Sequence, residues 1–248
     1  MEKFGLIGYP IAHSLSPKLF KEAYDGRWDY DLLEYTDFET AWNIFLSGPY
    51  KAINITAPFK ARAAAACDVR SAEVVASGAA NIAVKRDDGL HAHNSDVLAV
   101  KHLLSSLQSP HSSSPLSTSH AIASSASPLK VAVIGGGGAG RAALVAAESL
   151  GLSCRLYHHD ELAQGPIKAD TIVFTLPKAV PGLENLRCNT LIEANYKDPC
   201  CSSLPKAMHN SSCDHALPHF AHYISGIEWL RLQAALGYAL MTGLEPKF

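Results

Sequence analysis

The segment that decides the fold is LKVAVIGGGGAGRAALVAAESLG, residues 129–151. It starts with the short apolar run KVAVI, passes through four consecutive glycines and continues into an alanine-rich stretch typical of a helix. A strand, a glycine turn and a helix in this order are typical of nucleotide-binding βαβ units. The sequence therefore predicts an α/β unit with a parallel sheet in the second half of the chain.

The spacing of the glycines specifies the kind of site. Gly135, Gly137 and Gly140 fit the pattern G-x-G-x-x-G. Glycines at these positions permit a tight turn and a close approach of the backbone to a pyrophosphate, and the helix N-terminus adds N–H groups and a positive dipole end. We predict a dinucleotide site at these residues, with Gly138 in the same turn and Arg141 supporting a phosphate. A glycine turn that serves only packing is the alternative.

The residues after this helix bear on which dinucleotide would bind. The next expected strand, residues 153–159, ends on His158 and His159 and is followed by Asp160. An acidic residue at this position is typical of NAD sites, and an arginine there is typical of NADP sites. Arg155 lies inside the expected strand rather than at its tip, and histidines gain positive charge only towards pH ~6.5. The residues alone leave NAD and NADP open.

The rest of the chain alternates strands and helices. Residues 105–128 are rich in serine and proline and contain no charged side chain, which predicts a surface linker and a domain boundary. Before it, apolar strand-like runs alternate with helical patterns from residue 3 onward, and after it two more apolar runs, at 169–177 and 189–196, complete a small parallel sheet. We expect two α/β domains.

Composition excludes several classes of partner. The 248 residues are 48% hydrophobic and 18% charged with a net charge of −2, so neither nucleic acid nor an anionic membrane is expected to bind. No apolar run approaches the ~18 residues of a membrane-spanning helix. The six cysteines are scattered, apart from the adjacent Cys200 and Cys201, and form no CxxC pattern. We predict reduced thiols, no metal site and a cytoplasmic protein.

Seven short motifs together resemble one family, the shikimate dehydrogenases. In chain order they are FGLIGYPIAHSLSP, NITAPFK, GAANIAV, HAHNSDVLA, GGGGAGRA, EANYKDP and GIEWLRLQAALGYALMTGLEP. The chain departs from the family pattern at Ala92 and Ala99, which replace glycines, and at Ile82, which replaces threonine. The usual Asn-Arg-Thr after the second nucleotide strand reads Tyr-His-His at 157–159, and the serine-rich segment is an addition.

The resemblance implies a fold and an activity. The family reduces 3-dehydroshikimate to shikimate reversibly with NADPH, in chorismate and aromatic amino-acid biosynthesis. It implies a substrate domain with a mixed sheet at 1–104, completed by a C-terminal helix at 226–248, and a small Rossmann-type domain at 129–225, with the reaction in the cleft between them. The resemblance favours NADP over NAD. A quinate/shikimate dehydrogenase that uses NAD and an inactive nucleotide-binding homologue are the alternatives, and we expect a monomer or homodimer.

The resemblance also implies roles for the polar residues of the first part. Ser14 and Ser16 lie in a turn that leads into a helix, where hydroxyl and free N–H groups can hold the substrate carboxylate. Lys60 follows a strand and Pro58, at a point where the chain must turn. Hydride addition to a ketone builds charge on oxygen, and Lys60 held beside Asp96 can stabilise that charge and supply the proton.

The remaining substrate groups are hydroxyls, and the resemblance assigns them to uncharged side chains. Amide groups both donate and accept hydrogen bonds and can fix hydroxyl orientation. The residues implied are Thr56, Asn81 and Gln233, with Tyr196 contacting the substrate or lining the nicotinamide pocket. His158 is assigned to the cofactor. A helix-surface role for Gln233 and a packing role for Tyr196 are the alternatives.

Overall fold

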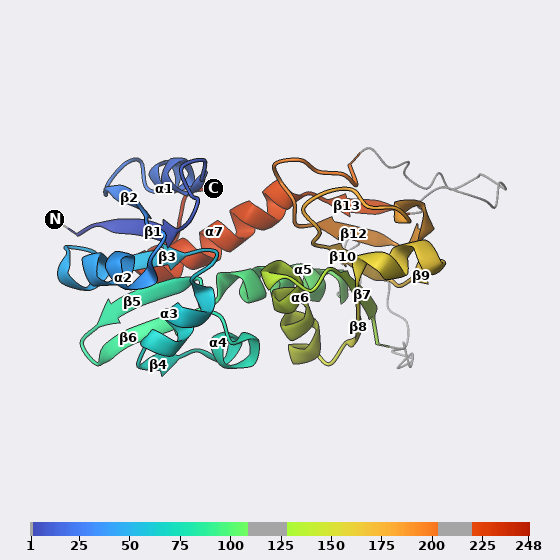
Figure 1. Ribbon diagram of the computed structural model, residues 1–248, viewed down its shortest axis with the longest axis horizontal. Coiled ribbons are helices and arrows are strands. Elements are labelled where there is room, and N and C mark those ends of the chain that lie inside the picture. The colour runs from blue at the N-terminus through green and yellow to red at the C-terminus, as the bar shows by residue number, and fades with distance from the viewer. Residues whose placement is uncertain (1, 109–127, 203–219) are drawn as a thin grey trace, which may run out of the picture. The chain divides into compact units, whose positions relative to one another are not determined.

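The computed structural model describes residues 2–108, 128–202 and 220–248 (Figure 1). Its contacts divide the chain into two compact units: Met1–Ala99 together with Leu230–Phe248, and Val100–Trp229. These boundaries fall within two helices, a few residues from the expected ones. Most of the predicted serine-rich linker, residues 109–127, lies outside the described residues.

The first unit is built on a six-stranded sheet with the order β2-β1-β3-β5-β6-β4. β1 pairs in parallel with β2 and β3, β5 runs antiparallel to β3 and β6, and β4 is parallel to β6. The sheet is therefore mixed, as the resemblance implied. The strands are β1 Phe4–Gly8, β2 Tyr30–Glu34, β3 Ala52–Ile55, β4 Val69–Arg70, β5 Ile82–Arg86 and β6 Gly89–His93.

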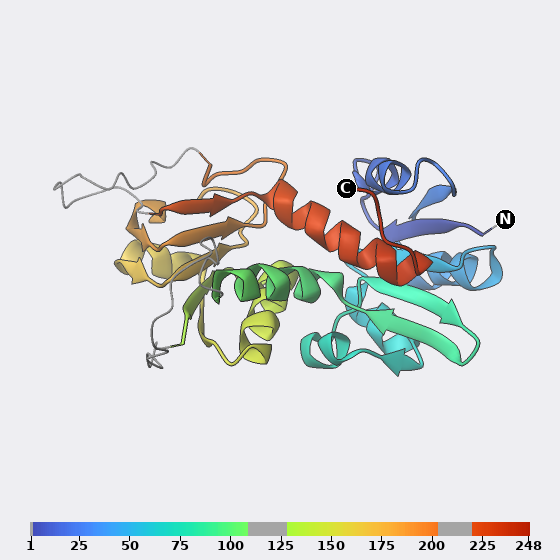
Figure 2. The ribbon, with the colours of Figure 1, turned by 180° about the vertical axis from the view of Figure 1, so that it is seen from behind.

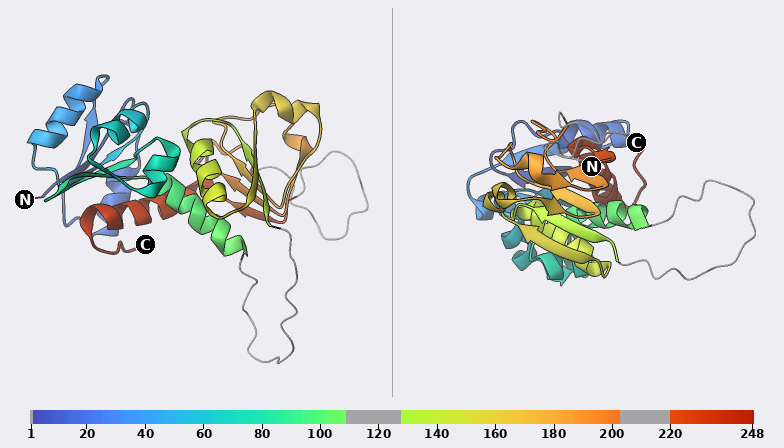
Figure 3. Two further views of the ribbon diagram at one scale, coloured as in Figure 1. Left: turned by 90° about the horizontal axis from the view of Figure 1, so that it is seen from below. Right: turned by 90° about the vertical axis from the view of Figure 1, so that its right-hand side faces the viewer.

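Helices cover both faces of this sheet, because successive side chains of a strand point to opposite faces. Ile53 faces a cluster that includes the buried aromatic residues of α2 and two alanines of α3. Ala52 and Ile82 face α1 and the last three turns of α7 (Figures 2 and 3). Tyr238 of α7 packs edge-on against Phe20 of α1 at 5.0 Å between ring centroids. The helices are α1 Ser16–Ala23, α2 Phe38–Ser47, α3 Lys60–Ala66, α4 Ala72–Ser77 and α7 Gly226–Thr242.

The second unit contains the predicted small parallel sheet. Its order is β13-β12-β10-β7-β8, every described pair is parallel, and α6 packs against β7, β8 and β10. Strand β13 was not predicted. The elements are β7 Lys130–Ile134, α6 Gly138–Ser149, β8 Ser153–Tyr157, β10 Thr171–Phe174, β12 Thr190–Glu193 and β13 His222–Ile224, with the short η1 His159–Gln164, β9 Ile167–Lys168, η2 Leu183–Asn185 and β11 Leu186–Arg187.

Two predicted segments end differently in the structure. Strand β8 stops at Tyr157, before the two histidines, because the backbone N–H of His158 donates to the Glu161 carboxylate at 2.7 Å and caps η1. The first residues of the predicted linker, 105–108, instead complete α5 (Ser95–Gln108). Apolar side chains at helical spacing, ending with the fully buried Leu104, extend that helix.

The C-terminal helix is shorter than the predicted 226–248. It ends at Thr242, because Gly243 takes a left-handed conformation with φ of +75° that stops a helix. Pro246 follows and cannot continue it. Among the helices that the structure describes, none combines the length and the apolar character needed to cross a bilayer.

Candidate active site

Lys60 and Asp96, the two predicted catalytic residues, form an ion pair. The turn after β3 leads directly into α3, and Lys60 is the first residue of that helix. Its Nζ atom lies 2.6 Å from Oδ2 of Asp96. The lysine side chain is 27% exposed and the aspartate 13%. The ammonium is thus held in place by a partly shielded carboxylate while still being reachable from solvent.

Asp96 owes its position to Asn94, a residue that the sequence analysis did not single out. The Asn94 Oδ1 atom accepts hydrogen bonds from the backbone N–H groups of Asp96 at 3.1 Å and Val97 at 3.3 Å, which caps α5. Its Nδ2 atom donates to Ser77 Oγ at 3.0 Å and to the Ala79 carbonyl at 2.9 Å. An asparagine just before a helical pattern is an N-cap signal that could have identified it. The first turn of a helix also favours a carboxylate such as Asp96.

Asn81 is buried and reciprocally bonded to Ser95. Its Nδ2 donates to Ser95 Oγ at 3.0 Å, and the Ser95 backbone N–H donates to its Oδ1 at 2.8 Å. Gly237 of α7 closes on this pair: a Cβ atom there would lie 3.0 Å from both Ser95 Oγ and Ile82 Cδ1. The amide orientation of Asn81 is therefore fixed, and the approach of α7 depends on a glycine.

Ser14 and Ser16 lie together where α1 begins. Ser14 Oγ accepts from the Ser16 backbone N–H at 3.2 Å and lies 3.2 Å from Ser16 Oγ. The hydroxyl of Tyr238, on α7, donates to the Ser16 carbonyl at 3.1 Å. Two hydroxyl groups are thus presented side by side at a helix N-terminus that α7 holds in place. Both serines are partly buried.

Thr56 and Gln233 are also partly buried in the first unit. The Thr56 methyl group fits against β1 because Gly8 has no side chain; a Cβ atom at Gly8 would lie 2.3 Å from Thr56 Cγ2. Gln233 lies one turn before Gly237 on α7, and therefore on the same face of the helix. Asn54, on β3, is engaged elsewhere: its Oδ1 accepts from the Tyr30 hydroxyl at 2.7 Å.

In the second unit the glycine turn has the geometry that its spacing predicted. Gly135 has φ of +101°, in the left-handed region that favours glycine. A Cβ atom at Gly140 would lie 1.8 Å from the Gly135 carbonyl oxygen, so only glycine allows α6 to pack this closely on the turn. A Cβ at Gly137 or Gly138 would meet nothing within 4 Å. The Cα atoms of Gly137 and Gly138, where α6 begins, therefore border open space.

Two side chains flank this turn. Thr175, which follows β10 and was missed by the sequence analysis, places Oγ1 at 2.8 Å from the Ile134 carbonyl oxygen and 3.1 Å from that of Gly135. It ties the turn to the neighbouring strand. Arg141 is exposed in the first turn of α6, where its guanidinium is free to meet an anion.

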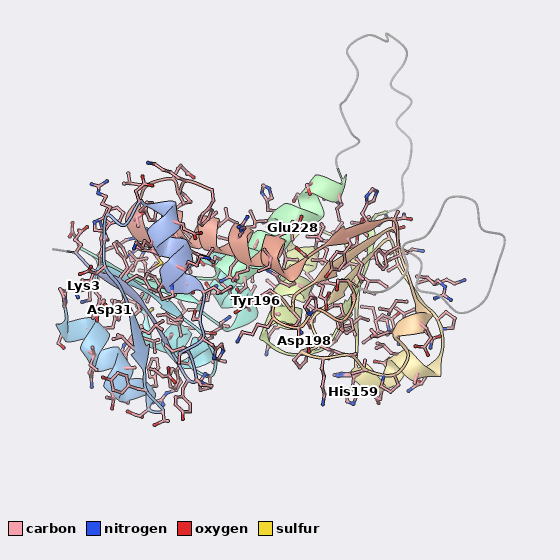
Figure 4. The ribbon with its side chains drawn as sticks, turned by 90° about the horizontal axis from the view of Figure 1, so that it is seen from above. Lys3, Asp31, His159, Tyr196, Asp198 and Glu228 are labelled. Atoms are coloured by element: carbon pink, nitrogen blue, oxygen red, sulfur yellow. The ribbon has the colours of Figure 1, made fainter. Side chains whose placement is uncertain are left out.

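The basic side chains near the end of β8 differ in whether they already have an acidic partner. The Arg155 guanidinium stacks on the Tyr157 ring at 4.4 Å and donates to Glu161 Oε1 at 3.1 Å. The same Glu161 carboxylate caps His158. His158 and His159 are both exposed, and Figure 4 labels His159 on η1. The histidines therefore stand free of ion pairs among the described residues, whereas Arg155 is tethered.

Tyr196 lies on the ordered loop after β12, where Figure 4 also labels Asp198. Asn195 organises this loop: its Nδ2 atom donates to the carbonyls of Pro177 at 2.8 Å and Asp198 at 2.6 Å. Gly226 approaches so closely that a Cβ atom there would lie 2.6 Å from Asn195 backbone atoms. Partial burial raises the pKa of the Tyr196 phenol above its usual value. Tyr196 is therefore neutral and held by a well-bonded loop.

The chain is similar to known proteins of one family. Residues 6–83, which contain Ser14, Ser16, Thr56, Lys60 and Asn81, match the family model described as the shikimate dehydrogenase substrate binding domain. The chain belongs to the shikimate dehydrogenase family. A relative in Halobacterium salinarum, named shikimate dehydrogenase (NADP(+)), is 34% identical over 179 residues, which cover 68% of this chain and 60% of the relative.

Other members of the shikimate dehydrogenase family match longer parts of the chain. A protein of the same name from an Anaeromyxobacter species is 30% identical over 202 residues, 79% of this chain and 62% of the relative. The matched region thus spans about three fifths of the length of these relatives. The crystal structure of Thermus thermophilus shikimate 5-dehydrogenase with NADP(H) and shikimate superposes with a TM-score of 0.72 at 22% identity, covering 100% of this chain and 95% of that one. The two-domain fold is therefore that of this family.

Proposed function

We propose that this protein is an NADP-dependent shikimate dehydrogenase, which reduces 3-dehydroshikimate to shikimate reversibly in chorismate and aromatic amino-acid biosynthesis. The observation that carries the proposal is the Lys60–Asp96 ion pair, at 2.6 Å, in a unit that matches the family's substrate-binding domain. The names of the relatives in Halobacterium salinarum and Anaeromyxobacter support the same reaction and the same cofactor.

Lys60 acts as the general acid in the direction of reduction. As hydride adds to the ketone carbon, negative charge builds on the ketone oxygen, and an ammonium beside it stabilises that charge and then donates a proton. Asp96 holds Nζ within hydrogen-bonding distance and limits the orientations that the lysine samples. In the reverse direction the neutral amine accepts the proton of the shikimate hydroxyl. Asp96 also accepts a hydrogen bond from a substrate hydroxyl.

The polar groups of the first unit bind the rest of the substrate. Ser14 and Ser16 present two adjacent hydroxyls at the N-terminus of α1, a combination suited to a carboxylate. Asn81 has a fixed amide and orients a ring hydroxyl. Thr56 and Gln233 are partly buried polar side chains suited to the remaining hydroxyls. In the second unit, Tyr196 contacts the substrate.

The glycine turn of the second unit fits a dinucleotide. NADPH, when bound, supplies the hydride. The open backbone at Gly137 and Gly138 and the N-terminus of α6 suit its pyrophosphate. Gly135 and Gly140 maintain the turn, and we assign the side chains of Arg141 and His158 to phosphate groups. No arginine stands at the tip of β8, so the preference for NADP over NAD rests on the relatives' names and on these two side chains.

A single assay tests the proposal: oxidation of NADPH by the purified chain with 3-dehydroshikimate. We expect turnover that Lys60→Met lowers by about 10²–10⁴-fold, with NADPH preferred to NADH at equal concentration. In the reverse direction shikimate should be oxidised and quinate, which carries an extra hydroxyl on the carboxylate-bearing carbon, should not. Folded protein without turnover would contradict the enzyme reading. A preference for NADH that is lost on changing Asp160 would contradict the cofactor assignment alone.

We further propose that the protein works in the cytoplasm as a monomer or homodimer, without nucleic-acid partners. The net charge of −2 and the scattered cysteines support this proposal. Light scattering of the purified chain would report its mass in solution, and a tetramer or larger assembly would contradict it.

A further inference from the structure

The second unit contains a buried carboxylate that has no role in the proposed reaction. Glu193 is the last residue of β12 and is fully buried. Its Oε1 atom accepts from the Cys200 backbone N–H at 2.7 Å, and its Oε2 atom accepts from the Cys201 N–H at 3.2 Å and from the Tyr223 hydroxyl. These bonds satisfy a buried charge and join β12, the following loop and β13. They also fix the direction of both carboxylate oxygens.

Two thiols converge on this carboxylate. Cys200 Sγ lies 3.4 Å from Glu193 Oε1 and 3.9 Å from Cys201 Sγ. The three ligand atoms all lie within 4.8 Å of one another. We propose that Glu193, Cys200 and Cys201 form a binding site for zinc or another thiophilic divalent cation.

The distances match a face of a tetrahedral zinc site. With Zn–S bonds of about 2.3 Å and Zn–O bonds of about 2.1 Å, tetrahedral angles place two sulfurs about 3.8 Å apart and a sulfur and an oxygen about 3.6 Å apart. The observed separations are 3.9 Å between Cys200 Sγ and Cys201 Sγ and 3.4 Å between Cys200 Sγ and Glu193 Oε1. A cation can therefore bind with little movement of these atoms.

The charge of the site also suits a divalent cation. Binding of one divalent cation displaces both thiol protons, so two positive charges enter as two protons leave. The net charge of the buried cluster does not change. The cation takes the place of the Cys200 S–H that faces Glu193.

The groups around the three ligands act as outer-shell partners. The backbone N–H groups of Cys200 and Cys201 and the Tyr223 hydroxyl hold the Glu193 carboxylate in its present orientation. Such partners orient ligands and strengthen metal binding. Cys201 is fully buried but Cys200 is partly exposed, which leaves a route for the ion. A bound ion would link Glu193 to Cys200 and Cys201, and so would fix both ends of the loop of residues 194–199, which carries Tyr196.

The test uses the reduced, metal-free full chain and Co²⁺ as the probe. We expect one Co²⁺ per chain to produce the thiolate-to-cobalt charge-transfer band and the strong visible bands of tetrahedral coordination, and Zn²⁺ to displace it. Cys200→Ser and Cys201→Ser should each weaken binding at least tenfold. Cys154→Ser is the matched control, since Cys154 is a partly buried thiol on β8 of the same unit, and it should bind like the parent chain.

A second measurement on the unchanged chain avoids reliance on the variants. Zn²⁺ should slow alkylation of Cys200 and Cys201, located by peptide mass spectrometry, and leave the rate at Cys154 unchanged. The proposal is overturned if no thiolate band appears, if both serine variants keep the band, or if Zn²⁺ protects neither cysteine. Formation of a Cys200–Cys201 disulfide in place of metal binding under reducing conditions would overturn it as well. None of these outcomes depends on dehydrogenase activity.

Discussion

Replacing Lys60 by methionine tests the mechanism most directly, because methionine keeps much of the lysine stem and removes only the charge. Losing a general acid typically costs about 10²–10⁴ in rate, which corresponds to about 2.7–5.4 kcal/mol of activation free energy. The structure gives a second cost: Asp96, 13% exposed, loses the partner at 2.6 Å, a loss of roughly 1–3 kcal/mol in stability. The capped N-terminus of α5 still supports that carboxylate. The chemical effect should therefore exceed the structural one.

Steady-state kinetics with 3-dehydroshikimate, at a temperature where circular dichroism shows the variant folded, separates these effects. We expect kcat to fall by about 10²–10⁴-fold with KM nearly unchanged, because the charge on the reacting oxygen exists only in the transition state. Lys60→Ala should behave similarly, with an added packing loss. The matched control is Lys51→Met, which removes a surface ion pair with Glu2 and should leave both constants unchanged. A near-normal kcat with a raised KM would show that Lys60 only binds substrate and would refute the mechanism.

Three further predictions concern single residues. Ser14→Ala should raise KM and leave kcat nearly unchanged in the same assay, since the carboxylate it holds is the same in the ground and transition states; a large fall in kcat alone would contradict that role. Gly140→Ala should unfold or distort the second unit, because its Cβ would lie 1.8 Å from the Gly135 carbonyl oxygen. Gly137→Ala meets nothing within 4 Å, so it should keep the fold and weaken only the binding of NADPH, as measured by calorimetry. Equal melting temperatures for the two variants would contradict this prediction. Burial lowers the pKa of His93 below its usual 6.5. As the pH drops from ~6.5 towards the lower folded value, the unfolded state therefore binds the proton first, and the stability of the folded protein should fall. His93→Gln should flatten this pH dependence of the melting temperature, and an unchanged slope would disprove the assignment.

The local patterns of the sequence predicted the fold well where one feature dominates. The glycine spacing predicted a tight turn, and the left-handed conformation of Gly135 and the close contact of Gly140 with it form such a turn. The ends of elements were less predictable. Strand β8 stops at Tyr157 because a carboxylate four residues later captures the next backbone N–H, and a strand pattern does not contain that competition. Similarly, serines at 105 and 106 suggested a loop, but the burial of Leu104 extends α5 through them.

In the candidate site, too, some features were predicted from the sequence and others were not. Lys60 and Asp96 were paired by resemblance, and the structure places them in contact. Asn94 and Thr175 were missed, because their roles consist of bonds to backbone groups that only the folded chain brings near. The cluster of Glu193 with two cysteines has no metal-ligand spacing in the sequence. It arises because the loop after β12 turns back on the strand's last residue.

The first unit is assembled from both ends of the chain, and this affects how it forms during translation. Its sheet and α1 are made from the first 99 residues, yet Ala234, Tyr238 and Met241 of α7 complete the core that contains Phe20 and Ile82. At ordinary rates of synthesis, roughly ten seconds separate the emergence of these two parts from the ribosome. During that interval the apolar face of the sheet that α7 will cover remains exposed, while all of the second unit is synthesised. The half that is translated first therefore finishes folding last, and chaperones have their longest opportunity to act on it.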